Sequence, residues 1–348
     1  MVEMNQTKCD LAFQLAYHPV YRIAQFYTFS ISMIAAPSLL YFMVKRLFCL
    51  HFHGNLKTLL IAYFISIFLY AAVLCFDFGY HFLVPFVVTN KCSLIIDKGL
   101  FQTLHVPTLF LLTTPMWFPL GFMIERFIAM GMACRYEKTP TILGPVLVIV
   151  LLTPNFFIFH SIFENEKYDD IFISFLMLPN TSAVQFNNYL WYLLYLKIGN
   201  LLGNFVLLLV HKWFKSRYLQ QKSTLTVRYA MEEISQSSKF TLIITFTHLL
   251  FFGTYTVCSI LVRVLGQPFF GSFINHYVAR GVNCAIPTYN FVIVFVAFKS
   301  LQELNSRRSM QIQTTVQIKT TGSEGYKNYA DATVSRWATI TSGRKSVY

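Results

Sequence analysis

The chain has 348 residues, of which 55% are hydrophobic and only 12% are charged. A soluble domain carries about twice that share of charge, so the composition argues against one large soluble core. The net charge of +13 would suit a nucleic-acid partner, but the basic residues lie in short segments between apolar blocks, which argues against that partner. No zinc-ligand spacing, phosphate-binding glycine loop or HExxH motif occurs, so we predict neither a metal site nor a cofactor.

The apolar residues form seven blocks of about 20 residues, the length at which an α-helix crosses a bilayer. The pattern predicts an all-α membrane protein folded as a seven-transmembrane-helix bundle. The blocks are Arg22 to Val44, Thr58 to Phe78, Leu100 to Ile124, Thr141 to Phe163, Asn188 to Val210, Phe240 to Val262 and Ile274 to Phe298.

The distribution of positive charge predicts the orientation of this bundle. Of the 28 Lys and Arg residues, 20 fall after blocks 1, 3, 5 and 7, and five fall on the opposite side. Because the richer side is normally cytoplasmic, we expect the amino terminus outside and the carboxy terminus in the cytoplasm. Two glycosylation sequons, at Asn5 and Asn180, both fall on the predicted outer side and agree with this orientation.

The predicted segments are an extracellular amino terminus (1–21), the transmembrane domain (22–298) and a cytoplasmic tail (299–348). The amino-terminal segment is too short for a separate ligand-binding domain, so we expect any ligand among the helices. The tail is polar, and past one amphipathic turn at Phe298 to Leu304 we expect disorder. Before block 6, the stretch TVRYAMEEISQSSKF has helix-forming composition and predicts an inward extension of that helix.

Two of the seven cysteines, Cys9 and Cys92, lie outside the membrane on the predicted oxidising side. We predict that they form a disulfide between the amino terminus and the top of helix 3, although two free thiols would also fit the sequence.

Charged side chains within the apolar blocks are few, and such residues are candidates for function. They are Asp77, Lys197 and Arg280. Asp77 could pair with either base, which would leave the other base without an acid. A surplus cation beside an aromatic cavity would suit a small amphipathic carboxylic acid.

Several polar groups could line such a site with these cations. Asn200 shares a helix face with Lys197, and Gln102 shares one with His105. Tyr255 is a candidate for the cavity wall. Hydrogen bonding between helices, without any ligand, is the alternative role for these polar groups.

The pair Glu125-Arg126 ends the third block at the predicted inner face. It could simply meet the lipid headgroups. It could also form a lock, in which Glu125 holds Arg126 until activation frees it for a heterotrimeric G protein. Further candidates for contact with that partner are Arg135, Tyr136 and Arg228.

Several stretches resemble the nematode serpentine chemoreceptors of class beta, and they span nearly the full length. Among them are CDLAFQLAYHPVYR at Cys9, GFMIERFIAMGMACRYE at Gly121 and PTYNFVIVF at Pro287. The resemblance implies a multi-pass G-protein-coupled receptor in the plasma membrane of sensory neurons, in a dendrite or cilium, that detects small external chemicals. It also favours the lock role for Glu125 and Arg126.

A ligand-gated channel or a small-molecule transporter is the alternative function. Transporters often contain paired halves with broken helices, and no such repeat is evident here. An enzyme is not expected, because the scattered histidines include no set at ligand or catalytic spacing.

Overall fold

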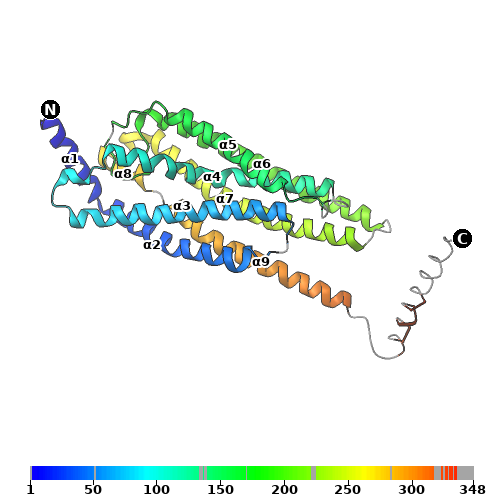
Figure 1. Cartoon of the computed structure of the whole chain (residues 1–348). Helices are drawn as coiled ribbons and strands as arrows, with labels where there is room; N and C mark the ends of the chain where they lie inside the picture. Colours follow the sequence, from blue (N-terminus) through cyan, green and yellow to red (C-terminus); the bar gives the residue numbers. More distant parts are fainter. Residues whose placement is uncertain are drawn as a thin grey trace. The chain divides into compact units, whose positions relative to one another are not determined.

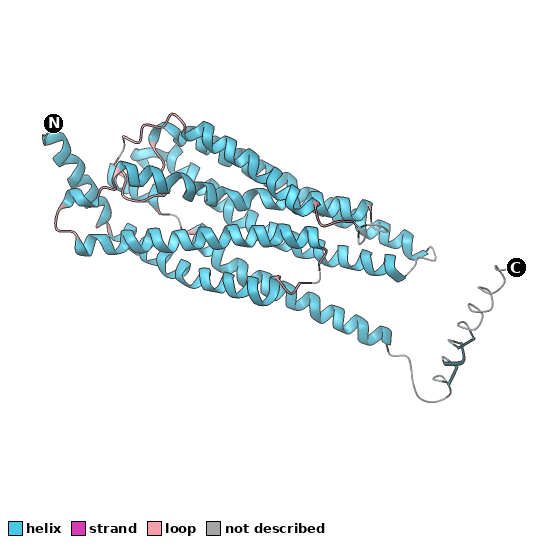
Figure 2. Ribbon diagram, viewed as in Figure 1, coloured by secondary structure: helices cyan, strands magenta, loops and turns pink. Residues whose placement is uncertain are grey.

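The structure is a computed structural model that describes residues 2–50, 52–132, 136, 139–169, 171–220, 225–282 and 284–316, and a few residues between 323 and 334. Within these residues all regular structure is helical (Figure 2). The chain forms two compact units, Met1–Phe298 and Lys299–Tyr348.

Seven helices in the described part of the chain are long and apolar enough to cross a membrane, which confirms the predicted seven-helix fold. Figure 1 shows the long helices of the first unit running side by side as a bundle. The elements are α1 (Val2–Ala16), α2 (Pro19–Phe42), η1 (Met43–Leu47), α3 (Gly54–Val87), η2 (Lys91–Leu94), α4 (Lys98–Gly131), α5 (Leu143–Phe163), α6 (Asn180–Gln220), α7 (Leu225–Phe270), α8 (Phe273–Gly281) and α9 (Ala285–Val316).

Most helices run beyond their apolar blocks. As predicted, α7 begins at Leu225, well before the sixth block. The tail differs from the prediction, because α9 continues to Val316, far past the single turn expected after Phe298.

The seventh block is divided into two helices, which the sequence did not reveal. Before it, the chain turns at Gly266 and Gly271, whose positive φ angles of 64° and 71° suit glycine. The helix α8 is N-capped by Ser272 and ends where Val282 adopts an extended conformation. The short segment between α8 and α9 therefore replaces one continuous span with two helical pieces.

One end of the bundle, called here the disulfide end, is closed by an apolar cap. A disulfide joins Cys9 of α1 to Cys92 of η2. The backbone N–H of Ile96 donates to the carbonyl of Phe172 at 2.9 Å, and the Phe172 ring stacks on Phe101 at 3.7 Å between centroids. The cap consists of Ala12, Leu15, Ala16, Tyr21, Leu94, Ile96, Phe101, Tyr168, Phe172, Ile173, Phe175, Met177 and Val278.

Candidate functional site

A buried charged cluster lies at the other end of the bundle, called here the Arg126 end. Glu125 and Arg126 are both fully buried in α4. The guanidinium donates from Nε to Glu125 Oε2 and from Nη2 to Oε1, each at 2.5 Å. Its remaining nitrogen, Nη1, donates to the hydroxyl of Ser237 on α7 at 2.5 Å. We name Glu125, Arg126, Tyr136 and Ser237 the Arg126 cluster.

Tyr136 supports Glu125 from the segment after α4. Its hydroxyl donates to Glu125 Oε1 and accepts from Asn55 Nδ2 at 3.4 Å. Burial raises the pKa of the Tyr136 phenol, and the Glu125 carboxylate raises it further, so this hydroxyl remains a donor at neutral pH. The amide of Asn55 also accepts from the backbone N–H of Gly144 at 3.0 Å, which connects the cluster to α5.

The cluster holds α7 against α3 and α4. Besides the Ser237 contact, Glu233 of α7 accepts a hydrogen bond of 2.7 Å from the backbone N–H of His53, which precedes α3. The pairing of Glu125 with Arg126 is the one that the sequence suggested. Sequence reasoning missed Ser237, because a serine in a helix-forming stretch carries no signal of a partner 111 positions away.

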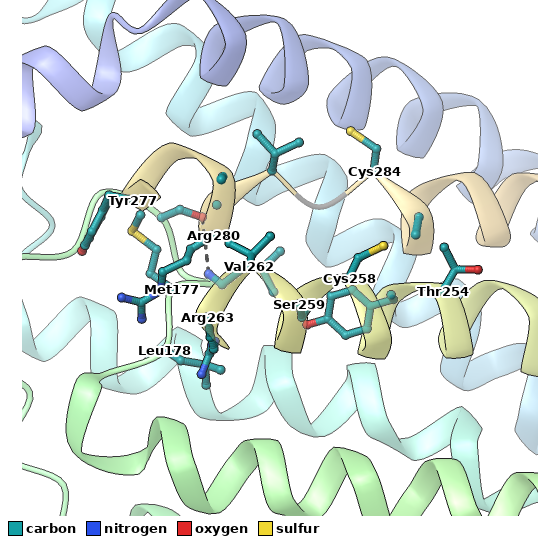
Figure 3. A pocket seen from close by; sticks show the side chains of 17 residues that line it. Met177, Leu178, Thr254, Cys258, Ser259, Val262, Arg263, Tyr277, Arg280 and Cys284 are labelled. Carbon is teal, nitrogen blue, oxygen red and sulfur yellow. Dashed lines mark hydrogen bonds between the residues drawn. The ribbon is translucent and has the colours of Figure 1, made fainter. Parts of the chain in front are cut away.

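Near the disulfide end, a cavity of about 260 Å³ opens between α7, α8, the start of α9 and the loop before α6 (Figure 3). We name it the two-arginine cavity, after Arg263 of α7 and Arg280 of α8. Its walls include Thr254, Tyr255, Cys258, Ser259, Val262, Tyr277 and Cys284. The lining therefore combines hydroxyl and aromatic groups with two permanent cations.

The two guanidinium groups of this cavity donate hydrogen bonds only to neutral oxygens among the described residues. Both side chains line the same cavity. Arg263 Nη1 donates to the carbonyl of Ala183 at 3.4 Å, and both terminal nitrogens of Arg280 lie 3.5 Å from Asn180 Oδ1. Among the residues that the structure describes, no carboxylate lies within 4.0 Å of either arginine. Such an uncompensated pair can attract an anion.

The structure brings only two of the predicted ligand residues, Tyr255 and Arg280, to this cavity. Gln102 is exposed, whereas His105 is fully buried and holds the carbonyl of Phe175 at 2.6 Å. The expectation that Gln102 and His105 face one site is therefore wrong, because only His105 of these two side chains lies on the buried face of α4.

Lys197 and Asn200 are buried in α6, but neither lines the two-arginine cavity. Arg263 does line it. No feature of the sequence indicated this, because Arg263 falls just past the sixth block and resembles a loop residue. The helix in fact continues past Arg263 and is interrupted only at Gly266.

The predicted pairing of Asp77 with Lys197 or Arg280 is wrong. Asp77 is buried in α3 with its Oδ1 2.8 Å from Nε2 of His81, one turn further along the same helix. This i,i+4 contact on its own helix is the ion-pair contact of Asp77, and within the described residues neither Lys197 nor Arg280 lies within 4.0 Å of the carboxylate.

The remaining predicted residues are only partly described. Asn180 is exposed at the start of α6, where its amide contacts Arg280. The side chains of Asn5 and Arg228 and the whole of Arg135 lie outside the described residues. In the described part of the chain, no cluster of three metal-ligating side chains occurs.

Glu166 organises the loop before α6. Its Oε1 accepts from the hydroxyl of Thr181 and from the backbone N–H groups of Lys167 and Tyr168. Burial alone would raise the pKa of Glu166, but these hydrogen bonds lower it below its usual range.

Comparisons with known proteins agree with the seven-helix fold. The family model described as "Serpentine type 7TM GPCR chemoreceptor Srb" matches residues 17–252. Relatives from Caenorhabditis elegans match almost end to end. The chain is 68% identical to serpentine receptor class beta-13 (98% of this chain, 99% of the relative) and 63% identical to class beta-5 (98% and 99%). It is 52% identical to class beta-12, with 99% of each chain covered.

Proposed function

This chain belongs to the Srb family of serpentine seven-transmembrane chemoreceptors, and from this premise we propose that it is a G-protein-coupled receptor for a small external carboxylic acid. The family consists of receptors and not of enzymes. The observation that carries the ligand class is the two-arginine cavity, in which Arg263 and Arg280 have no described acidic partner.

The dimensions and lining of the cavity support a small amphipathic ligand. Its volume of about 260 Å³ lies just below the usual range for drug-sized ligands. A carboxylate can accept from two guanidinium groups at once, and an alkyl chain can pack along Tyr255 and Val262. A matched alcohol would leave the two cations uncompensated and bind less tightly.

Coupling to a heterotrimeric G protein would begin at the Arg126 cluster. In the arrangement described, every terminal nitrogen of Arg126 is engaged within the protein. Release of Ser237 would separate α7 from α4 and free a permanent cation at the end of the bundle. A ligand can favour this open state only by binding it more tightly than the closed state.

The proposed function implies one orientation of the receptor in the membrane. The Arg126 end would face the cytoplasm and the disulfide end the outside, as the distribution of basic residues predicts. The site of action would be the plasma membrane of a sensory neuron, at a dendrite or cilium, with Asn5 and Asn180 available for glycosylation.

The test is calcium imaging in cells that express the receptor with a promiscuous G protein. Medium-chain carboxylic acids are compared with alcohols and amines of the same chain length. Acids should elicit responses that fall at least tenfold in potency in Arg263→Gln and in Arg280→Gln at equal surface expression. The matched control is Lys167→Gln, which removes an exposed loop cation outside the cavity. Equal potency of acids and alcohols would refute the ligand class and leave the receptor assignment intact.

A further inference from the structure

Lys197 is a buried cation that the proposed function leaves unused. It lies in the span Asn180–Phe214 of α6, and its exposed fraction is only 3%. In the part of the chain that the structure describes, its Nζ has no hydrogen-bond partner and no carboxylate within 4.0 Å. Its one defined contact is the ring of Phe252 on α7, 4.5 Å from Nζ to the centroid. An ammonium group in an apolar interior is strongly unfavourable without a counter-charge.

Other unsatisfied polar groups surround this ammonium. His248 of α7 is fully buried, packs its ring 4.2 Å from that of Phe252, and has neither ring nitrogen bonded among the described residues. Lys197 and His248 both contact the ring of Phe252, so the two groups are near neighbours. Asn200, one turn from Lys197, has a buried amide nitrogen that likewise lacks a described partner.

The character of these groups indicates an anion. An ammonium and the amide nitrogen of Asn200 can only donate, and an imidazole can donate from one nitrogen in its neutral form. Three such groups, all buried and without a described partner, match the environment in which proteins hold small anions. A metal cation would meet repulsion from Lys197.

The burial of all three groups, away from the two-arginine cavity, favours a monatomic anion. Lys197, Asn200 and His248 do not line the two-arginine cavity, so an organic ligand there cannot neutralise them. A halide needs little more room than a water molecule, which fits among packed side chains.

We propose that Lys197, Asn200 and His248 bind a chloride ion between α6 and α7. The site is separate from the proposed acid cavity and does not depend on it. Because the His248 ring stacks on Tyr289 of α9 at 4.9 Å, a bound anion would also join a third helix to this contact. The anion would therefore stabilise the packed bundle.

The test uses the purified full-length receptor in lipid nanodiscs, with no ligand and no G protein. Its melting temperature is followed by tryptophan fluorescence in equal concentrations, about 150 mM, of sodium chloride, sodium bromide or sodium gluconate. We expect the wild type to melt about 2 °C higher in either halide than in gluconate. The reason is that an ion that binds only the folded state raises the melting temperature.

Two variants assign the effect to the site. Lys197→Met keeps the unbranched chain as far as Cε but removes the ammonium group, and this variant should melt at the same temperature in all three salts. Lys212→Met removes an exposed lysine from the same helix and should respond as the wild type does.

A direct measurement covers the case in which Lys197→Met does not fold. Radiolabelled chloride should bind the wild type at one saturable site, and His248→Phe should weaken that binding about tenfold. The proposal is overturned if the wild type shows no saturable binding, or if the halide shift persists in Lys197→Met. Either result would leave the receptor function and the acid cavity untouched, because neither enters this experiment.

Discussion

Removing one hydroxyl, in Ser237→Ala, tests the Arg126 cluster most directly. Ser237 is fully buried, and its Oγ accepts from Arg126 Nη1 at 2.5 Å while bonding only to carbonyls of its own helix otherwise. The substitution therefore breaks the contact between α4 and α7 and leaves the Glu125–Arg126 pair in place.

The expected effect follows from the kind of bond that is lost. A hydrogen bond to a charged group contributes about 1.5–3 kcal/mol when buried. A loss of about 2 kcal/mol from the closed state alone raises the ratio of open to closed receptor about 30-fold. If about 1% of wild-type receptors are open without ligand, about 20% of the Ser237→Ala receptors would be open under the same conditions.

The assay is basal G-protein activation, measured by energy transfer between labelled G-protein subunits at matched surface expression. The neighbouring variant Ser238→Ala is the control, because Ser238 is also buried but its hydroxyl has no described partner. Basal activity should rise severalfold in Ser237→Ala and stay at the wild-type level in Ser238→Ala. Equal basal activity in the two variants would show that the Ser237 contact does not hold the receptor closed.

Three further predictions concern stability. Cys9→Ser, Cys92→Ser and the double variant should each lower stability equally, by about 4 kcal/mol for a loop of 83 residues, as measured by thermal unfolding; unequal losses would contradict a shared bond. Because the folded-state pKa of Glu166 is lowered, its carboxylate stabilises the fold above about pH 4.3, and this contribution is lost as the pH falls through the lowered value. Acidification from about pH 5 to pH 3 should therefore lower the melting temperature of the wild type more than that of Glu166→Gln. Gly144→Ala should cost about 1–3 kcal/mol, because the new Cβ would lie 2.6 Å from a backbone oxygen of α3, whereas Gly131→Ala meets nothing within 4 Å and should be tolerated in the same unfolding assay.

The number and type of helices could be predicted because hydrophobic length is a local property. Seven apolar blocks are sufficient to predict seven spans, and the composition after Leu225 predicts the long start of α7. The division between α8 and α9 could not be predicted in this way, since the apolar run continues through Val282 and only the backbone conformation breaks it.

Contacts between side chains on different helices were harder to predict from the sequence. The adjacent residues Glu125 and Arg126 suggested their own pairing, because neighbouring opposite charges are visible in a sequence. Which acid meets which base over long distances is decided by helix rotation. Asp77 and His81 lie one turn apart on α3 and share a face however the helix is rotated, so this contact could have been read from the sequence. Whether Asp77 also reaches Lys197 depends on how α3 and α6 are rotated, which no local pattern indicates.

The length of α7 has a mechanical consequence. Between Arg263 at the two-arginine cavity and Ser237 at the Arg126 cluster, the helix is continuous and contains no proline. At 1.5 Å per residue these positions are about 39 Å apart, so the helix can act as a stiff lever. A tilt of about 5° at the cavity would move Ser237 by roughly 3 Å, which exceeds the range over which a hydrogen bond to Arg126 survives. Under the proposed mechanism, a ligand that shifts its arginine contacts only slightly would therefore open the far end of the bundle.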